Sequence, residues 1–234
     1  MNGFRGFPKE CVDFYLELAK NNNKTWFDDH KSDYEKYVMD PAKDFVYSMG
    51  VLLKKLSPNI TADPRVNKSI FRLYRDTRFS NDKTPYKTHL GIFFWEGNGP
   101  KMEFSGYYFH LEPPTMFLAA GMHCFSRSRL ELYRNSVIDS ESGPRLAEAV
   151  ESVTANSGYS VGGKHYKKLP RGYTAEGKTG ELLLHNGLYA MTEMQIPTEL
   201  YSADLLEYCF SAFKKMSPLH QWLTEMINRG AAFG

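Results

Sequence analysis

Paired cysteines and long apolar runs are missing from this sequence. It has three cysteines, Cys11, Cys124 and Cys209, and none of them belongs to a C-x-x-C pair. An odd number without that spacing argues against a disulfide framework and against a thiolate zinc site. We therefore expect three buried thiols in a protein of a reducing compartment.

No segment approaches the roughly 18 apolar residues that a membrane span requires. The N-terminal stretch MNGFRGFPKECVDFY also lacks the apolar centre of a signal peptide. Together these absences predict a soluble, cytoplasmic protein without a membrane partner.

The motifs of several large enzyme classes are absent as well. The chain has no Gly-x-x-x-x-Gly-Lys-Ser/Thr loop, no Gly-x-Gly-x-x-Gly after a strand and no Gly-x-Ser-x-Gly elbow. P-loop phosphoryl transfer, Rossmann dinucleotide chemistry and the α/β-hydrolase mechanism are therefore not expected. The seven histidines form no H-E-x-x-H or H-x-H pair, so the sequence predicts no metal site and names no cofactor.

Aromatic residues, in contrast, are abundant. The 16 Phe, 15 Tyr and 3 Trp make up 15% of the 234 residues. They predict a core of large flat side chains, many with a hydroxyl group that needs a hydrogen-bond partner. No linker, repeat or low-complexity tract divides the chain, and we expect one domain over residues 1–234.

The first sixty residues have helical periodicity. Thr25 is the expected N-cap of a second helix that runs to about Met39, and Pro41 is expected to open a third. Three central segments then show the alternation and turn-forming boundaries of strands, which favours an antiparallel meander. These segments are His89–Glu96, Glu103–Leu111 and Thr115–Met122.

Helical patterns return in the last part of the chain, beginning with Ser126–Ile138. A late strand is expected at Leu188–Ile196. Two helices, about Ser202–Met216 and Pro218–Arg229, are expected to close the chain. Helices, then strands, then helices predict an α+β fold with a helical N-terminal third, a largely antiparallel central sheet and C-terminal helices.

The positive charge of the chain is concentrated in residues 71–89, FRLYRDTRFSNDKTPYKTH. Residues 72–89 hold three Arg and two Lys against two Asp, a local charge of +3, whereas the whole chain carries +2. Because a guanidinium group matches the oxygens of phosphate and carboxylate groups, this basic segment predicts an anion-binding cleft for a small ligand. Its expected ligand-binding residues are Arg72, Arg75, Asp76, Arg78, Lys83, Tyr86, Lys87 and His89.

In that cleft, Asp76 and Tyr86 would orient other groups or handle protons, and His89 or His110 would border it. Tyr108 and His110 share one face of the expected middle strand. For His110, a half-buried side chain that is hydrogen-bonded to a tyrosine is the favoured interpretation. A strand is expected through Tyr74, with a loop after it.

A purely structural role of the basic segment is the main alternative. Its charged residues would then form ion pairs with carboxylates of the N-terminal helices, such as Asp28, Asp29 or Asp33. Exposed pairs of this kind contribute about 0–1 kcal/mol. The protein would in that case be a scaffold or interaction protein.

Nucleic-acid binding is a further alternative. A second basic cluster has aromatic residues between its cations, as single-strand binders do. Its members are Lys164, Tyr166, Lys167, Lys168, Arg171 and Tyr173. A solvated loop remains the favoured interpretation of this cluster, so nucleic acid is not the favoured partner.

The basic segment also resembles a known family. Arg72-x-x-Arg75-Asp76-x-Arg78-Phe79, followed by Asp82-Lys83-x-x-Tyr86, is similar to the RxxRDxRFxx[DN]KxxY signature of an uncharacterised family of bacterial proteins, also found within longer fungal proteins. The stretches NNNKTWF, SGYYFHL and KKLPRGY extend the resemblance over most of the chain. The resemblance implies a domain of unknown function and no catalytic residue. Whether the protein is an enzyme, and its oligomeric state, stay open.

Overall fold

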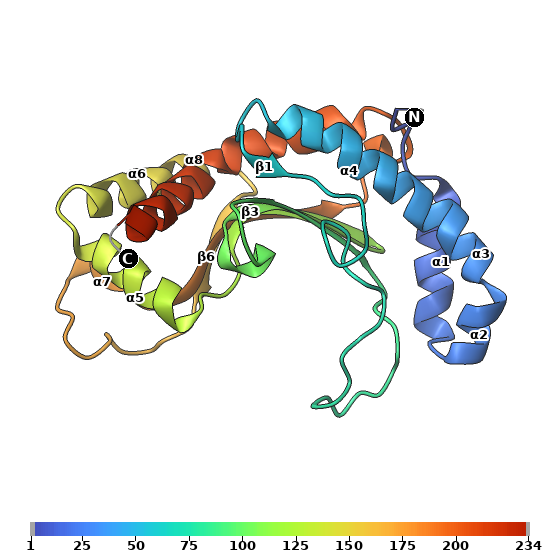
Figure 1. Cartoon of the computed structure of the whole chain (residues 1–234), viewed down its shortest axis with the longest axis horizontal. Coiled ribbons are helices and arrows are strands. Elements are labelled where there is room, and N and C mark those ends of the chain that lie inside the picture. Colours follow the sequence, from blue (N-terminus) through green and yellow to red (C-terminus); the bar gives the residue numbers. More distant parts are fainter. Residues whose placement is uncertain (1–2, 233–234) are drawn as a thin grey trace. The chain divides into compact units, whose positions relative to one another are not determined.

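The computed structural model describes residues 3–232 and confirms the α+β class (Figure 1). Two compact units can be distinguished by the contacts within them. Unit 1 comprises Met1–Phe94, Tyr108–Phe117 and Glu193–Ser211, and unit 2 comprises Trp95–Tyr107, Leu118–Thr192 and Ala212–Gly234. The single domain over residues 1–234 stays a prediction.

One antiparallel sheet contains the six strands found in residues 3–232. In spatial order the strands are β1 (Ile60–Thr61), β2 (Leu90–Glu96), β3 (Gly106–Glu112), β4 (Thr115–Met122), β6 (His185–Gln195) and β5 (Ser160–Lys164). The three expected central strands are therefore confirmed, with β3 starting three residues later than expected. The late strand is also confirmed, whereas β5 has no counterpart among the expected strands.

The N-terminal helices of unit 1 follow one another almost without interruption. They are α1 (Lys9–Lys20), α2 (Lys24–Asp29), α3 (Lys31–Asp33), the π-helix η1 (Tyr34–Met39) and α4 (Asp40–Leu53). The expected cap at Thr25 is wrong, because the Asn23 side chain accepts the hydrogen bond from the Trp26 amide at 3.0 Å. Pro41 opens α4 as expected, since it lies in the first turn of that helix, which follows η1 directly.

Aromatic rings fill the core of unit 1, as the composition predicts. Phe109 of β3 packs on Phe45 of α4 at 4.9 Å between ring centroids and on Phe7 at 5.8 Å. Phe45 also contacts Phe4 at 5.2 Å. Alternation along β3 buries Phe109 completely and leaves Tyr108 on the other face, which is the face that carries the candidate site described below.

Unit 2 is mainly helical outside its strands. Its complete helices are the 3-10 turn η2 (Lys101–Glu103), α5 (Arg127–Ile138), α6 (Ser142–Thr154) and α7 (Gly177–Leu182). Ser126 caps α5 by accepting a hydrogen bond from the Arg129 amide, and Tyr133 of that helix is fully buried. Unit 1 holds the last 3-10 turn, η3 (Thr198–Tyr201).

The last helix, α8, runs from Leu205 to Ala232 with Pro218 inside it. The expectation of two helices that meet at this proline is therefore wrong. Pro218 has no amide proton for the carbonyl group four residues before it. That carbonyl, of Lys214, accepts a hydrogen bond from Ser217 Oγ at 2.8 Å, so the helix continues.

Two of the three cysteines behave as expected. Cys11 and Cys209 are buried, and burial raises the pKa of both thiols well above the ordinary range. The expectation for Cys124 is wrong, because this residue, two positions after the end of β4, is exposed. None of the helices in residues 3–232 has the length and apolarity needed to cross a membrane.

Candidate functional site

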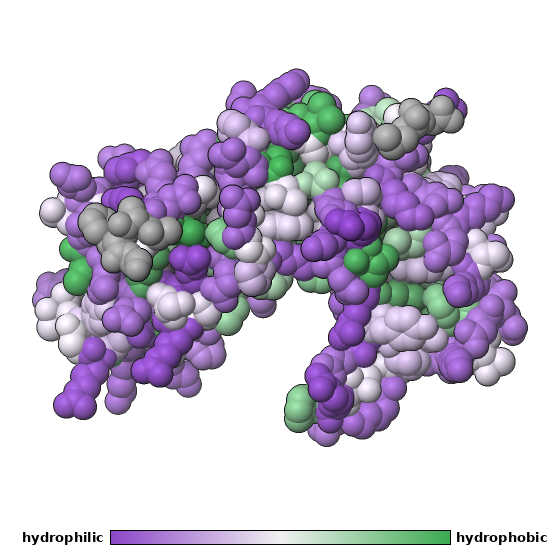
Figure 2. Space-filling view, in the orientation of Figure 1, coloured by the Kyte–Doolittle hydropathy of each residue, from purple (hydrophilic) through white to green (hydrophobic). Residues whose placement is uncertain are grey.

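The basic segment leaves the body of unit 1 and returns to it as a loop (Figure 1). An antiparallel bridge between Tyr74 and Tyr86 closes its base. Two backbone hydrogen bonds flank this bridge, from Arg75 N to Pro85 O at 2.9 Å and from Lys87 N to Leu73 O at 2.8 Å. Figure 2 shows the projecting part as largely hydrophilic. Instead of the expected strand through Tyr74, this segment has isolated bridges, of which Ile70–Ile92 and Tyr74–Tyr86 are antiparallel.

The cations of the projecting loop bind acceptors within the same loop. Arg75 contacts the Asp82 carboxylate and the Thr84 hydroxyl. Arg78 donates two hydrogen bonds to the Asp76 carboxylate, from Nε to Oδ1 at 2.9 Å and from Nη2 to Oδ2 at 2.7 Å. The partners are therefore local carboxylates, in place of Asp28, Asp29 or Asp33, which the structural alternative gave as examples. These pairs form because the partners are close in the sequence. Arg78 and Asp76 are two residues apart and Arg75 and Asp82 are seven apart, so a tight loop brings their charges together without any tertiary contact.

Electrostatics within the loop follow from these bonds. The Arg78 side chain holds the pKa of Asp76 at about 2. The Thr84 amide, followed by Arg75, does the same for Asp82. Lys83 donates to the Thr77 carbonyl oxygen at 2.9 Å. Three of the five predicted cations thus hold the loop in shape.

The other two predicted cations lie at the base of the loop. Lys87 is partly buried, and its pKa is lowered by burial first and by the positive charge of Arg72 second. Its ammonium group lies 5.5 Å from the centroid of the Phe71 ring. Within residues 3–232, no carboxylate raises the pKa of Lys87. A half-buried ammonium that feels the charge of a guanidinium thus has no ion-pair partner among the described residues.

Tyr86, also predicted as a ligand-binding residue, lies in the core. Its side chain is 2% exposed, and its ring packs 4.6 Å from Phe27 and 5.2 Å from Tyr74. Burial is the main cause that raises the pKa of its hydroxyl group. The ring therefore supports the base of the loop.

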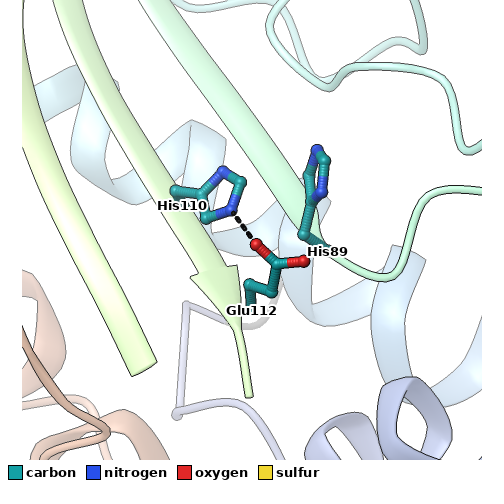
Figure 3. A group of neighbouring side chains, drawn as sticks. All are labelled: His89, His110 and Glu112. Atoms are coloured by element: carbon teal, nitrogen blue, oxygen red, sulfur yellow. Dashed lines mark hydrogen bonds and ion pairs between the residues drawn. The ribbon is translucent and has the colours of Figure 1, made fainter. Parts of the chain in front are cut away.

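His89, the last predicted residue, belongs to a cluster with His110 and Glu112 (Figure 3). Because β2 and β3 are antiparallel neighbours, the residue before β2 lies beside the end of β3. The two imidazole rings are 4.3 Å apart between centroids. His110 Nε2 lies 3.3 Å from Glu112 Oε2, and one potential ligand atom from each of the three residues falls within 4.8 Å of the others.

Neighbouring side chains hold this cluster in place. The Tyr108 hydroxyl group lies 2.9 Å from His110 Nδ1, which agrees with the tyrosine-bonded histidine expected from the sequence. Thr88 Oγ1 donates to Glu112 Oε1 at 3.1 Å. The Phe117 ring stacks on His110 at 4.3 Å. Each polar atom of His110 and Glu112 that faces away from the centre of the cluster thus has a defined partner.

Both histidines of the cluster are uncharged at neutral pH. Burial lowers the pKa of His89 to about 4, and the neighbouring His110 adds to this effect. Burial also lowers the pKa of His110, against the opposing influence of Glu112. Lys87 acts electrostatically on both rings, which places its ammonium group near the cluster.

Two imidazoles and a carboxylate are a donor set that binds divalent metal ions. The sequence motifs searched for, H-E-x-x-H and H-x-H, do not describe it. The sequence did contain one indication of this site. Tyr108, His110 and Glu112 alternate along a strand, which places three polar side chains on the same face. His89 could not be added from the sequence, because 21 positions separate it from His110 and only strand pairing brings them together.

Unit 2 contains a second chain of polar groups, which joins Ser105, His220 and Glu96. Ser105 Oγ lies 2.8 Å from His220 Nδ1, and His220 Nε2 lies 3.0 Å from Glu96 Oε2. The residue types are those of a hydrolytic triad. Because Ser105 and His220 are both 0% exposed, no substrate reaches the hydroxyl group, and this chain stabilises the interior of unit 2.

Three of the six residues of the second basic cluster make contacts within unit 2, while Lys167, Lys168 and Arg171 are exposed. Lys164 pairs with Glu181. The hydroxyl group of Tyr166 donates to Asn186 Oδ1 at 3.3 Å, and that of Tyr173 donates to Asn135 Oδ1 at 2.7 Å. These hydrogen bonds fix the Tyr166 and Tyr173 rings, which are the rings on which nucleic-acid bases would have to stack.

Comparison with known proteins connects this geometry to a family. A family model described as a conserved hypothetical protein (DUF2461) matches residues 10–222. The chain belongs to this family. The basic segment and the His89–His110–Glu112 cluster both lie within the matched residues. No curated protein and no solved structure matches the chain.

Proposed function

We propose that the protein binds a small anionic ligand, with a phosphate or carboxylate group, at Arg72, Lys87 and His89. The observation that carries the proposal is the pair of like charges at the base of the loop. Burial and Arg72 both disfavour the charged form of Lys87. A bound anion would offset both effects, because it brings the missing counter-charge to a place where water is partly excluded.

The two cations suit complementary roles. The Arg72 fork can bind two oxygens of a planar carboxylate or of a phosphate, while the Lys87 ammonium supplies a point charge. His89, uncharged at neutral pH, can donate or accept one hydrogen bond at the same ligand. In this proposal Arg75, Arg78 and Lys83 act indirectly, because their internal bonds keep the loop in one conformation.

A thermal-shift screen tests the proposal. The panel contains phosphate, sulfate, nucleotides, sugar phosphates and carboxylic acids, all in the presence of EDTA. A ligand at 100 times its dissociation constant stabilises by about 2.7 kcal/mol, which is roughly 5–10 °C for a chain of this size. We expect such a shift for one anion class, and we expect Lys87→Gln and Arg72→Gln each to reduce it.

Lys24→Gln is the matched control, since Lys24 is an exposed lysine at the start of α2 in the same unit. Its shift should equal that of the wild type. If no anion shifts the melting temperature, or if the shift survives in both Arg72→Gln and Lys87→Gln, the proposal is wrong.

A nucleic-acid partner makes a different prediction in the same screen. Short oligonucleotides would stabilise the protein, and the effect would fall steeply with salt because neutralised phosphates release counterions. A small anion held by two cations and a neutral histidine is the better match to the base of the loop. A strongly salt-dependent shift with oligonucleotides alone would reverse this preference.

A further inference from the structure

We infer that His89, His110 and Glu112 form a binding site for one divalent transition-metal ion of the zinc type. This inference does not rest on the proposed anion site, although the two sites are neighbours. Two histidines and a glutamate form a ligand set of catalytic zinc centres, where a fourth position stays open for water or substrate. The same donor types also accept Co²⁺, Fe²⁺ and Mn²⁺.

The spacing of the ligand atoms fits such an ion. Bonds of about 2.0–2.1 Å in a tetrahedron place two ligand atoms roughly 3.3–3.4 Å apart. His110 Nε2 and Glu112 Oε2 are 3.3 Å apart without an ion. All three candidate atoms lie within 4.8 Å of one another, so the largest separation exceeds the tetrahedral spacing by at most about 1.4 Å.

The surroundings of the ligands support the same conclusion. A metal-bound histidine usually donates its second ring N–H to a fixed partner, which sets the tautomer. Tyr108 is in place to accept that proton from His110 Nδ1, at 2.9 Å. The carboxylate is oriented in a similar way, because Thr88 occupies Glu112 Oε1 and leaves Oε2 facing His110.

The position of the cluster between core and solvent allows an ion to enter. His110 is buried, His89 is partly buried and Glu112 is exposed. A site with one wall in the core and one carboxylate at the surface keeps a side open for exchange and for an additional ligand. The buried Ser105–His220 pair of unit 2 lacks such access.

Charge balance connects the site to its neighbour. One carboxylate leaves a net charge of +1 on a bound divalent ion, and the Lys87 ammonium lies close enough to influence both histidines. An anion at Lys87 and Arg72 would therefore also approach the open position of the metal. If both proposals hold, the ligand is an oxyanion that is bound by the ion and the two cations together.

Zinc binding is measured on the full chain. The protein is stripped with a chelator, transferred to a phosphate-free buffer and titrated with Zn²⁺ by calorimetry, and elemental analysis gives the stoichiometry. We expect one ion per chain, and visible d–d absorption of a four-coordinate site when Co²⁺ replaces Zn²⁺. Glu112→Gln and His89→Asn should each weaken binding by about 100-fold, while Thr88→Val should weaken it by about 10-fold.

His123→Asn is the matched control, since His123 is an exposed histidine that contacts Tyr189 in unit 2. It should bind Zn²⁺ as the wild type does. The far-UV circular dichroism and the metal-free melting temperature establish that each variant is folded. Absence of stoichiometric binding in the wild type, or equal affinities in wild type, Glu112→Gln and His89→Asn, would overturn the inference.

The two proposals fail separately. Lys87→Gln should lose the anion shift measured in EDTA but retain one Zn²⁺ per chain. Glu112→Gln should show the reverse pattern, because Glu112 is not expected to contact an anion. Retention of the zinc site without any anion shift would contradict only the proposed function, and the opposite result would contradict only the metal site.

Discussion

The side chain of Asn22 forms two hydrogen bonds with the backbone of Tyr86. Asn22 Nδ2 donates to Tyr86 O at 2.9 Å, and Tyr86 N donates to Asn22 Oδ1 at 3.1 Å. The Asn22 side-chain amide thus satisfies both backbone groups of Tyr86, as a neighbouring strand would do. It attaches the loop to the turn between α1 and α2, and so connects the stretch NNNKTWF with the arginine-rich stretch 64 positions away.

Replacement of Asn22 by alanine should loosen the base of the loop. Two partly buried backbone groups of Tyr86 would lose their partners, and we expect a loss of about 1–3 kcal/mol in the free energy of unfolding. Chemical denaturation measures it. Asn21→Ala is the control, since the Asn21 side chain donates to the Glu17 carbonyl oxygen, four residues earlier in the chain. Equal stability of Asn22→Ala and the wild type would refute the role of this clamp.

Arg75→Ala should affect the loop more than the fold. The Arg75–Asp82 pair is partly exposed, with 26% and 57% of the two side chains accessible, and exposed pairs contribute little to stability. We expect nearly the wild-type melting temperature but faster proteolytic cleavage within residues 75–85. Limited proteolysis followed by mass spectrometry tests this. A large fall in the melting temperature would mean that the pair stabilises the whole unit.

Ser105→Ala should destabilise the protein, although Ser105 resembles a catalytic serine. The variant leaves buried His220 Nδ1 without its serine partner, which costs about 1–3 kcal/mol. The free energy of unfolding is compared with that of Ser157→Ala, where the serine is exposed. A hydrolase role would instead require inhibition by serine-directed reagents, and we expect no labelling of Ser105 in the folded protein.

Thiol reagents should distinguish Cys124 from the other two cysteines. Burial raises the pKa of Cys11 and Cys209 and also blocks access to them, whereas Cys124 is exposed. We expect one reactive thiol per chain in the native protein and three after denaturation. Peptide mapping should place the native label on Cys124. Native labelling of Cys11 or Cys209 would contradict the buried positions.

Acidic pH should reduce stability through His185. Burial lowers the pKa of its imidazole in the folded protein, with Lys164 acting in the same direction and Glu181 against it. The unfolded chain, with a histidine pKa near 6.5, therefore binds more protons, so stability is lost as pH falls below about 6.5. The free energy of unfolding should fall less between pH 7.5 and 5.5 in His185→Gln than in the wild type. Identical pH slopes would contradict this assignment.

Much of the secondary structure was predictable from the sequence because its causes are local. The alternation of Thr115–Met122 and its turn-forming neighbours predict β4 with the bounds that it has. The same alternation places Tyr107 and Phe109 on the buried face of β3 and Tyr108 on the other. Pro218 led to a wrong prediction, because proline usually ends a helix. Here the hydrogen bond from Ser217 Oγ to the Lys214 carbonyl oxygen satisfies the group that proline leaves without a donor, and the helix continues.

By itself, the sequence determined the α+β class, the aromatic core, the family and the concentration of positive charge in residues 72–89. Each of these depends on composition or on the order of neighbouring residues. Only the tertiary structure decided which cations form ion pairs within the described residues and which histidine lies beside His110. Strand pairing brings His89 to the end of β3, and the folded loop satisfies Arg75 and Arg78 while it leaves Arg72 and Lys87 at its base. Such contacts depend on distances in space, which spacing along the chain does not specify.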